Sequence, residues 1–137
     1  MATNADRYLD ESIIVGKTVK AASTVTKGYP VKLNTSDSSQ VLDCGAGEAC
    51  DGVALDSGAA GEDVRIVMAA GGGIVPMKVG TAGVTAGDWV KMTSDGIATE
   101  TPGGGTTVLH LIGKATQTGT VGHMVGVQLM PHVTVSS

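Results

Sequence analysis

The chain has 137 residues, enough for one domain or two very small ones, and 42% of its residues are hydrophobic. The formal net charge is −4 and lysine and arginine form no cluster, which argues against a surface that binds nucleic-acid phosphates. Phe is absent, whereas Val, Ile and Thr, which suit pleated strands, are frequent and 21 glycines separate them, so the composition predicts an all-β protein.

The N-terminal segment is polar and acidic. It lacks the basic start and apolar stretch of a secretion signal, and no apolar run reaches the length of a membrane span. We therefore expect synthesis in a cytoplasm and no membrane partner. Residues 1–14 show no clear period and are predicted to form an extended arm, with a simply disordered terminus as the alternative. The apolar anchors of this arm are Tyr8, Leu9, Ile13 and Ile14.

Residues 15–137 are expected to form a single β domain of short strands separated by turn residues. In residues 63–70, Val64, Ile66 and Met68 share one face of a strand, whereas Arg65 and Val67 share the other. The tail is expected to hold two strands separated by Pro131, and the last of them, with Val133 and Val135, pairs either within its own barrel or with a neighbouring subunit. The other expected strands are 13–19, 29–33, 40–44, 50–55, 74–79 and a strand through Trp89 to Lys91.

An internal repeat connects residues of about 24–70 with residues of about 83–131. The stretch TKGYPVKLNTSD begins at Thr26, and TAGDWVKMTSD begins at Thr85. The shared order, which includes VK and TSD, is difficult to obtain by chance, although the chain is rich in Gly and Val. Each copy is expected to supply about four strands, and the two copies to pack face to face or to close into one barrel. Further matches are Gly52 with Gly113, Ala54 with Ala115, Gly58 with Gly119, Gly61 with Gly122 and Val64 with Val125.

No residue pattern indicates catalysis, so we expect no enzyme, no cofactor and no metal. The sequence has no G-x-S-x-G elbow, and the spacing of its three histidines, His110, His123 and His132, matches no zinc pattern. Lys91 superficially resembles the modified lysine of biotinyl and lipoyl carrier domains. That lysine stands at a hairpin tip, however, whereas Lys91 is expected in a strand, before the turn.

Cys44 and Cys50 flank the turn GAGEA. Their spacing is not C-x-x-C and no histidine is close enough in sequence to complete a zinc site. Two reduced thiols are the favoured interpretation, with a disulfide across this short loop as the alternative.

The turn glycines and strand hydrophobics over residues 19–130 resemble the tailed-phage capsid decoration, or cement, proteins of the DUF2190 type. The similar segments are 52–55 (GVAL), 61–66, 85–90, 95–97 and 112–115. The resemblance implies a small β-barrel spike, commonly a homotrimer, on the outer surface of a bacteriophage head. Its partner would be the major capsid protein of the virion, whose subunit joints it would clamp.

Under this resemblance, the arm would order on the viral capsid, and Tyr8, Leu9, Ile13 and Ile14 would be its buried interface residues. The runner-up from another class is a surface- or carbohydrate-binding module of a phage fibre or spike. Such a module needs an aromatic platform for sugar stacking, and the chain offers little beyond Trp89.

Overall fold

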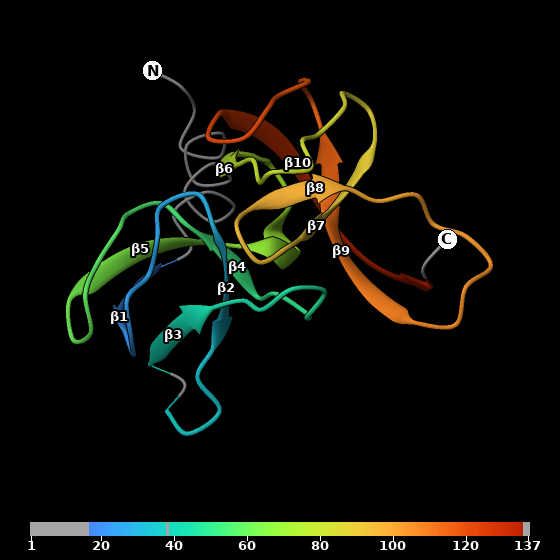
Figure 1. The fold of residues 1–137 in the computed structure, drawn as a ribbon. Helices are drawn as coiled ribbons and strands as arrows, with labels where there is room; N and C mark the ends of the chain where they lie inside the picture. The colour runs from blue at the N-terminus through green and yellow to red at the C-terminus, as the bar shows by residue number, and fades with distance from the viewer. Residues whose placement is uncertain (1–16, 38, 136–137) are drawn as a thin grey trace, which may run out of the picture.

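The computed structural model describes residues 17–37 and 39–135, whose regular secondary structure is β-strand apart from one short 3-10 helix, and this confirms the all-β prediction. The first half of the chain closes into a barrel with the strand order β1-β3-β2-β4-β5 (Figure 1). No helix in the described part of the chain is long and apolar enough to cross a membrane. The strands of the barrel are β1 (Lys17–Ala21), β2 (Pro30–Leu33), β3 (Gln40–Asp43), β4 (Gly52–Ala54) and β5 (Asp63–Met68).

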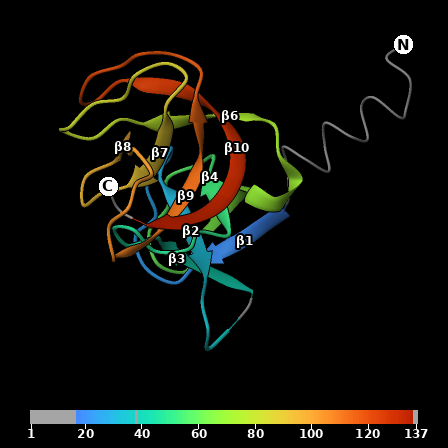
Figure 2. The same ribbon diagram turned by 90° about the vertical axis from the view of Figure 1, so that its right-hand side faces the viewer.

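The second half forms a five-stranded sheet with the order β6-β10-β9-β7-β8. A short 3-10 helix, η2 (Ala69–Gly71), connects it to the barrel at the point where the sequence predicted the end of a longer strand. Figure 2 shows how strongly β10 curves around the outside of this half. The strands of the sheet are β6 (Ile74–Lys78), β7 (Trp89–Met92), β8 (Ile97–Thr99), β9 (Val108–Ala115) and β10 (Met124–Val135).

The two halves have the same strand connectivity. In the first half, β1 pairs in parallel with β3 and antiparallel with β5. In the second half, β6 pairs antiparallel with β10, as β1 does with β5. A parallel bridge between Val79, which follows β6, and Ile97 of β8 corresponds to the parallel pairing of β1 with β3. Each copy therefore contributes five strands, one more than the sequence repeat predicted, because β1 and β6 are equivalent in pairing but not visibly alike in sequence.

Backbone hydrogen bonds repeat residue by residue between the copies. Val25 and Gly58 exchange two bonds, at 2.8 and 3.0 Å, and Val84 and Gly119 exchange two bonds at 3.0 and 3.1 Å. These two bridges lie at matching positions of the sequence repeat. The two copies therefore share a backbone structure and not only a composition.

Two matched glycines allow neighbouring strands to approach closely. A Cβ atom on Gly52 would lie 2.3 Å from the carbonyl oxygen of Val67, and one on Gly113 would lie 1.9 Å from that of Gln128. Real Cβ atoms do not come so near to a backbone oxygen, so both positions require glycine. The same constraint in both copies explains why this glycine recurs in the repeat.

A shared hydrophobic core joins the halves. On β5, Val64 and Ile66 point into a core cluster inside the barrel, whereas Val67 points outward into a second cluster. Val53 of β4 joins Val67 there, among residues of the second half. On the face that the sequence predicted for Arg65 and Val67, Val67 is buried and Arg65 is exposed. The second sheet packs against the outer face of the barrel at Val53 and Val67.

Polar contacts also cross the boundary between the halves. The hydroxyl of Tyr29 donates a hydrogen bond to the backbone oxygen of Asp95 (2.8 Å), and the amide of Lys78 donates to the carbonyl of Gly28 (2.9 Å). Burial, with a smaller effect of the nearby Asp95 charge, raises the pKa of Tyr29 above its ordinary value. The phenol is therefore neutral at physiological pH and remains a donor.

The prediction of two strands separated by Pro131 is wrong. A single strand, β10, runs through this position, and its pairing with β9 shifts between Leu129 and His132. Proline has no N–H for the ladder, so the register is interrupted locally, but pairing resumes beyond it. As a result, β10 extends past the core of the second half.

Candidate interaction surface

The ends of β9 and β10 leave the body of the protein as a two-stranded ribbon. We call residues 108–110 and 133–135 the projecting ribbon; Figure 1 shows it reaching away from the barrel toward the C-terminus. Val133 pairs with His110, and Val135 pairs with Val108, so these side chains share one face of the ribbon. Val108 and Val133 are 58% and 57% exposed, which makes this face unusually apolar for a solvated surface.

One edge of the ribbon lacks a partner strand. The neighbour on that side, β6, pairs with β10 only from Met124 to Gln128. Along residues 130–134 no strand within 17–37 and 39–135 continues this pairing. At the tip, the amide of Gly103 donates to the carbonyl of Val135 at 3.3 Å. An open edge of this kind can accept a strand from another chain.

The sequence-predicted interface residues fall into two groups. Val133 and Val135 lie in the projecting ribbon and pair with β9 of their own chain. A further pairing of this strand with a neighbouring subunit stays a prediction. The four anchors of the arm lie outside the described residues: Tyr8, Leu9, Ile13 and Ile14.

A groove of about 260 Å³ lies beside the ribbon. Its walls come from the turn after β3, from η2 and from the facing strands β9 and β10, with Cys50, Ala69, Ile112 and Pro131 among the lining residues. Most of the lining side chains are apolar, and the one carboxylate among them, Glu48, is ion-paired with Lys32, so the groove suits an apolar side chain better than a charged ligand.

The single tryptophan is partly covered by its neighbours. The rings of Trp89 and His132 stack with their centroids 5.3 Å apart, and the ammonium of Lys114 lies 5.0 Å from the centroid of Trp89. Stacking and cation–π contacts of this kind hold the indole in place. They also reduce the aromatic surface that a sugar ring could contact.

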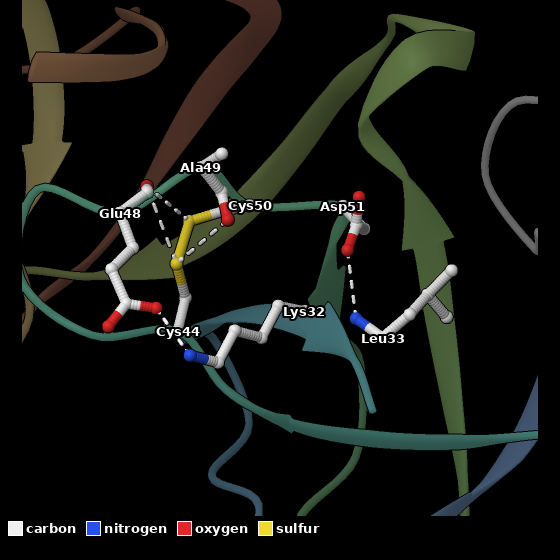
Figure 3. Close-up of a disulfide and its surroundings, with 7 residues drawn as sticks. All are labelled: Lys32, Leu33, Cys44, Glu48, Ala49, Cys50 and Asp51. Atoms are coloured by element: carbon white, nitrogen blue, oxygen red, sulfur yellow. Dashed lines mark hydrogen bonds and ion pairs between the residues drawn. A yellow bond between two sulfur atoms is a disulfide. The ribbon is translucent and has the colours of Figure 1, made fainter. Parts of the chain in front are cut away.

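Cys44 and Cys50 form a disulfide, so the favoured prediction of two reduced thiols is wrong. Their Cα atoms are 5.9 Å apart, within the range that a disulfide requires (Figure 3). The turn between them folds back tightly enough to bring the two cysteines together, which the spacing alone could not establish.

Reactive side chains do not converge among the described residues. No group of three or more His, Cys, Asp or Glu residues there could hold a metal ion. Lys91 lies within β7, pairs across the sheet with Ala98 and makes an ion pair with Glu100, a carboxylate that is 9% exposed. Lys91 is thus not presented at a hairpin tip, as the lysine of a carrier domain would be.

No protein-family model matches the sequence, and no curated protein matches it either. The surface must therefore be interpreted from its own geometry and from the sequence resemblance.

Proposed function

We propose that this protein is a structural decoration, or cement, protein that binds the outer surface of a phage head and stabilises contacts between major capsid protein subunits. The observation that carries the proposal is the projecting ribbon, which combines an apolar face with an open strand edge. Both features suit protein–protein contact. The sequence resemblance supplies the identity of the partner and is an argument by analogy.

The ribbon favours self-association of the decoration protein. An isolated two-stranded ribbon is only marginally stable in water, so this one would gain from a further contact. Residues 130–133 are exposed, and Val133 contributes apolar surface. Contact with a neighbouring subunit would cover both the edge and the valines. In a closed homotrimer, the ribbon of each subunit would contact a different part of the next subunit, so that the ring leaves no ribbon uncovered.

Trimerisation would strengthen attachment to the capsid. Three weak contacts joined in one assembly bind tightly, since the second and third form at high effective concentration. The arm would add a strand to a sheet of the major capsid protein, with Tyr8, Leu9, Ile13 and Ile14 as its anchors. In this mechanism the surface of the protein acts through contact and needs no reactive group.

The direct test mixes the purified protein with undecorated phage heads. We expect stoichiometric binding, measured by co-sedimentation and electron microscopy, and greater resistance of the decorated heads to heat. Heads that are already decorated serve as the control and should bind no more protein. Absence of binding to undecorated heads would refute the proposal.

A deletion of residues 2–12 tests the arm separately. We expect the shortened protein to fold and self-associate but to bind heads at least tenfold more weakly, because it lacks two of the four anchors. Circular dichroism checks the fold of the deletion variant. If this variant decorates heads with full affinity, the arm is not the capsid-binding element.

The alternative, a surface- or carbohydrate-binding module of a fibre or spike, has less support. Its aromatic platform would have to be Trp89, whose ring already stacks on His132. Glycan-array binding that depends on Trp89 would favour this alternative over decoration.

A further inference from the structure

The turn that connects β3 to β4 reaches across onto the second half of the molecule. We call residues 44–50 the clamp loop. At its tip the amide of Gly47 donates to the carbonyl of Met92 (3.0 Å), and the carbonyl of Gly47 accepts from the amide of His110 (3.3 Å). One residue of the first half therefore bonds to two strands of the second, β7 and β9.

The disulfide fixes the base of this loop. Cys44 is 3% exposed and Cys50 packs against the core that the two halves share. The disulfide brings the start and end of the loop together, so that Gly47 is held at a defined position relative to the barrel. Gly47 itself has a φ of 69°, a backbone conformation that residues other than glycine rarely adopt.

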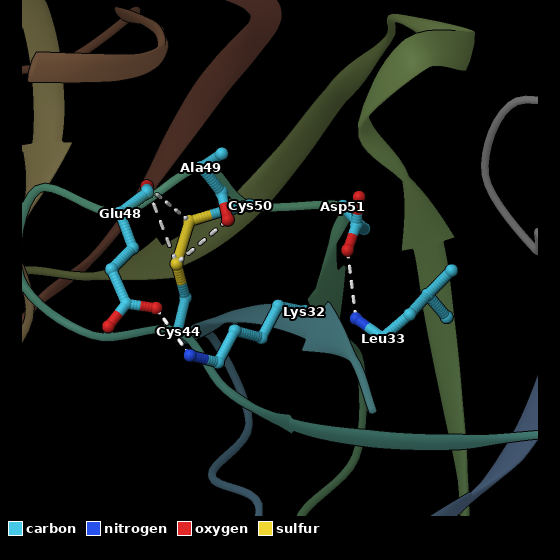
Figure 4. A network of polar contacts seen from close by, with 7 residues as sticks. All are labelled: Lys32, Leu33, Cys44, Glu48, Ala49, Cys50 and Asp51. Carbon is cyan, nitrogen blue, oxygen red and sulfur yellow. Dashed lines mark hydrogen bonds and ion pairs between the residues drawn. A yellow bond between two sulfur atoms is a disulfide. The ribbon is translucent and has the colours of Figure 1, made fainter. Parts of the chain in front are cut away.

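A second restraint acts on the exposed side of the clamp loop. The ammonium of Lys32, on β2, binds the carboxylate of Glu48, and this hydrogen bond lowers the pKa of Glu48 (Figure 4). At the end of the loop, the carboxylate of Asp51 accepts from the amide of Leu33 (2.8 Å). Both partners belong to the barrel, so they hold the loop to the first half only.

The second copy provides a built-in comparison. Its equivalent connection, between β8 and β9, spans residues 100–107 and contains no cysteine. Residues 101–104 of this connection are exposed. The crosslink is therefore not a requirement of the repeated fold. It occurs in the copy whose loop contacts the other half.

We propose that the disulfide makes the clamp loop a redox-sensitive clamp between the two halves. With the disulfide formed, the loop holds β7 and β9 against the barrel. With the disulfide reduced, the loop samples more conformations, the two bonds of Gly47 open, and the halves remain joined by their apolar core and by Tyr29.

The chemistry is a two-electron oxidation. The thiolate of one cysteine attacks a small-molecule disulfide, such as oxidised glutathione, and releases one small thiolate. The second cysteine thiolate then attacks the resulting mixed disulfide at the protein sulfur, forms the Cys44–Cys50 bond and releases the second small thiolate. Two protons leave the protein, and two electrons reduce the oxidant to two thiols. In a reducing cytoplasm the loop would be open, and in an oxidising medium it would close. This inference does not depend on the proposed function.

Hydrogen exchange on the intact chain tests the clamp. The oxidised protein is compared with the same protein reduced by a phosphine, with free thiols counted by mass spectrometry after alkylation. We expect the protection of the Gly47 and His110 amides to fall roughly 10- to 100-fold on reduction, the range expected for opening such a crosslink. Protection of the barrel amides of Val25 and Gly58, which bond to each other and not to the clamp loop, should fall much less.

A Cys44→Ala, Cys50→Ala double variant is the matched control. It should show the low protection of the reduced protein, and the phosphine should not change it. If this variant fails to fold, the reduced natural chain still provides the measurement. The clamp is refuted if protection at Gly47 and His110 does not change after complete reduction, and also if protection falls equally throughout the barrel.

Discussion

At the scale of single residues, both copies of the repeat have glycine where the backbones of two neighbouring strands approach closely. Gly113 lets β9 lie so close to the carbonyl of Gln128 that a side chain has no room. Its counterpart Gly52 stands in the same relation to Val67. Because the obstacle is a strand and not a flexible side chain, accommodation of a methyl group requires the sheet to shift.

We therefore expect Gly113→Ala to lower the free energy of unfolding by roughly 1–3 kcal/mol, the usual cost of overpacking. Chemical denaturation followed by far-UV circular dichroism measures the change. Gly104→Ala is the control, since a Cβ at Gly104 meets nothing within 4 Å; it should alter stability by less than about 0.5 kcal/mol. Equal stability of the Gly113 variant and the natural protein would show that β9 and β10 can separate at little cost.

At the scale of elements, β10 has two parts with different roles. From Met124 to Gln128 it is a central strand between β6 and β9. Beyond Pro131 it continues in the projecting ribbon, with one open edge and an apolar face. The first part stabilises the fold, whereas the second offers a surface to another chain.

We expect Val133→Asp to abolish self-association, because a charge would enter the apolar face that a neighbouring subunit would bury. Sedimentation velocity measures the oligomeric state over a range of concentrations. Val121→Asp makes the same chemical change at a site of matched exposure, 58% against 57%, and lies in the turn before β10. This variant should associate normally. A Val133 variant with unchanged sedimentation would remove the ribbon from the subunit interface.

At the scale of the whole molecule, the second half packs against the outer face of the barrel. The side chains of Val53 and Val67 point outward from the barrel and belong to the same core cluster as Val75, Met77 and Val127. Neither half can expose this cluster to water without a large loss of burial. The two halves should consequently unfold together.

Val67→Ala tests this coupling. We expect a loss of roughly 2 kcal/mol from the lost methyl groups and the cavity left behind. Matched reporters exist in the two copies, the amides of Val25 and Val84 in their equivalent bridges. Hydrogen exchange should show similar loss of protection at both. If Val25 loses protection and Val84 keeps it, the halves unfold independently.

Several features of the fold follow from local patterns in the sequence. The alternation of Val64, Arg65 and Ile66 predicted a strand with two distinct faces, and the structure has this strand as β5. Turn residues and repeated glycines located most of the other strands, because turn chemistry depends on residues next to each other in the chain. The proline in β10 was misinterpreted because its effect on a ladder depends on the partner strand.

The candidate surface was less accessible to such reasoning. The sequence suggested a strand through Val133 and Val135 that was available for pairing, but not that the ribbon leaves the core. The exposure of that strand depends on where β6 ends, and this is a property of two segments far apart in sequence. The disulfide has the same character, since spacing permits the bond and only the folded turn brings Cys44 and Cys50 together.

By itself, the amino-acid sequence determined the β class, most turns and the duplication, since side-chain alternation and turn chemistry act between near neighbours. The tertiary structure decided that the first copy closes into its own barrel, that Val67 faces a second core, and that Gly47 bonds across to the other half. These outcomes depend on which distant strands meet, and the free energy of that choice comes from burial and pairing summed over the whole chain.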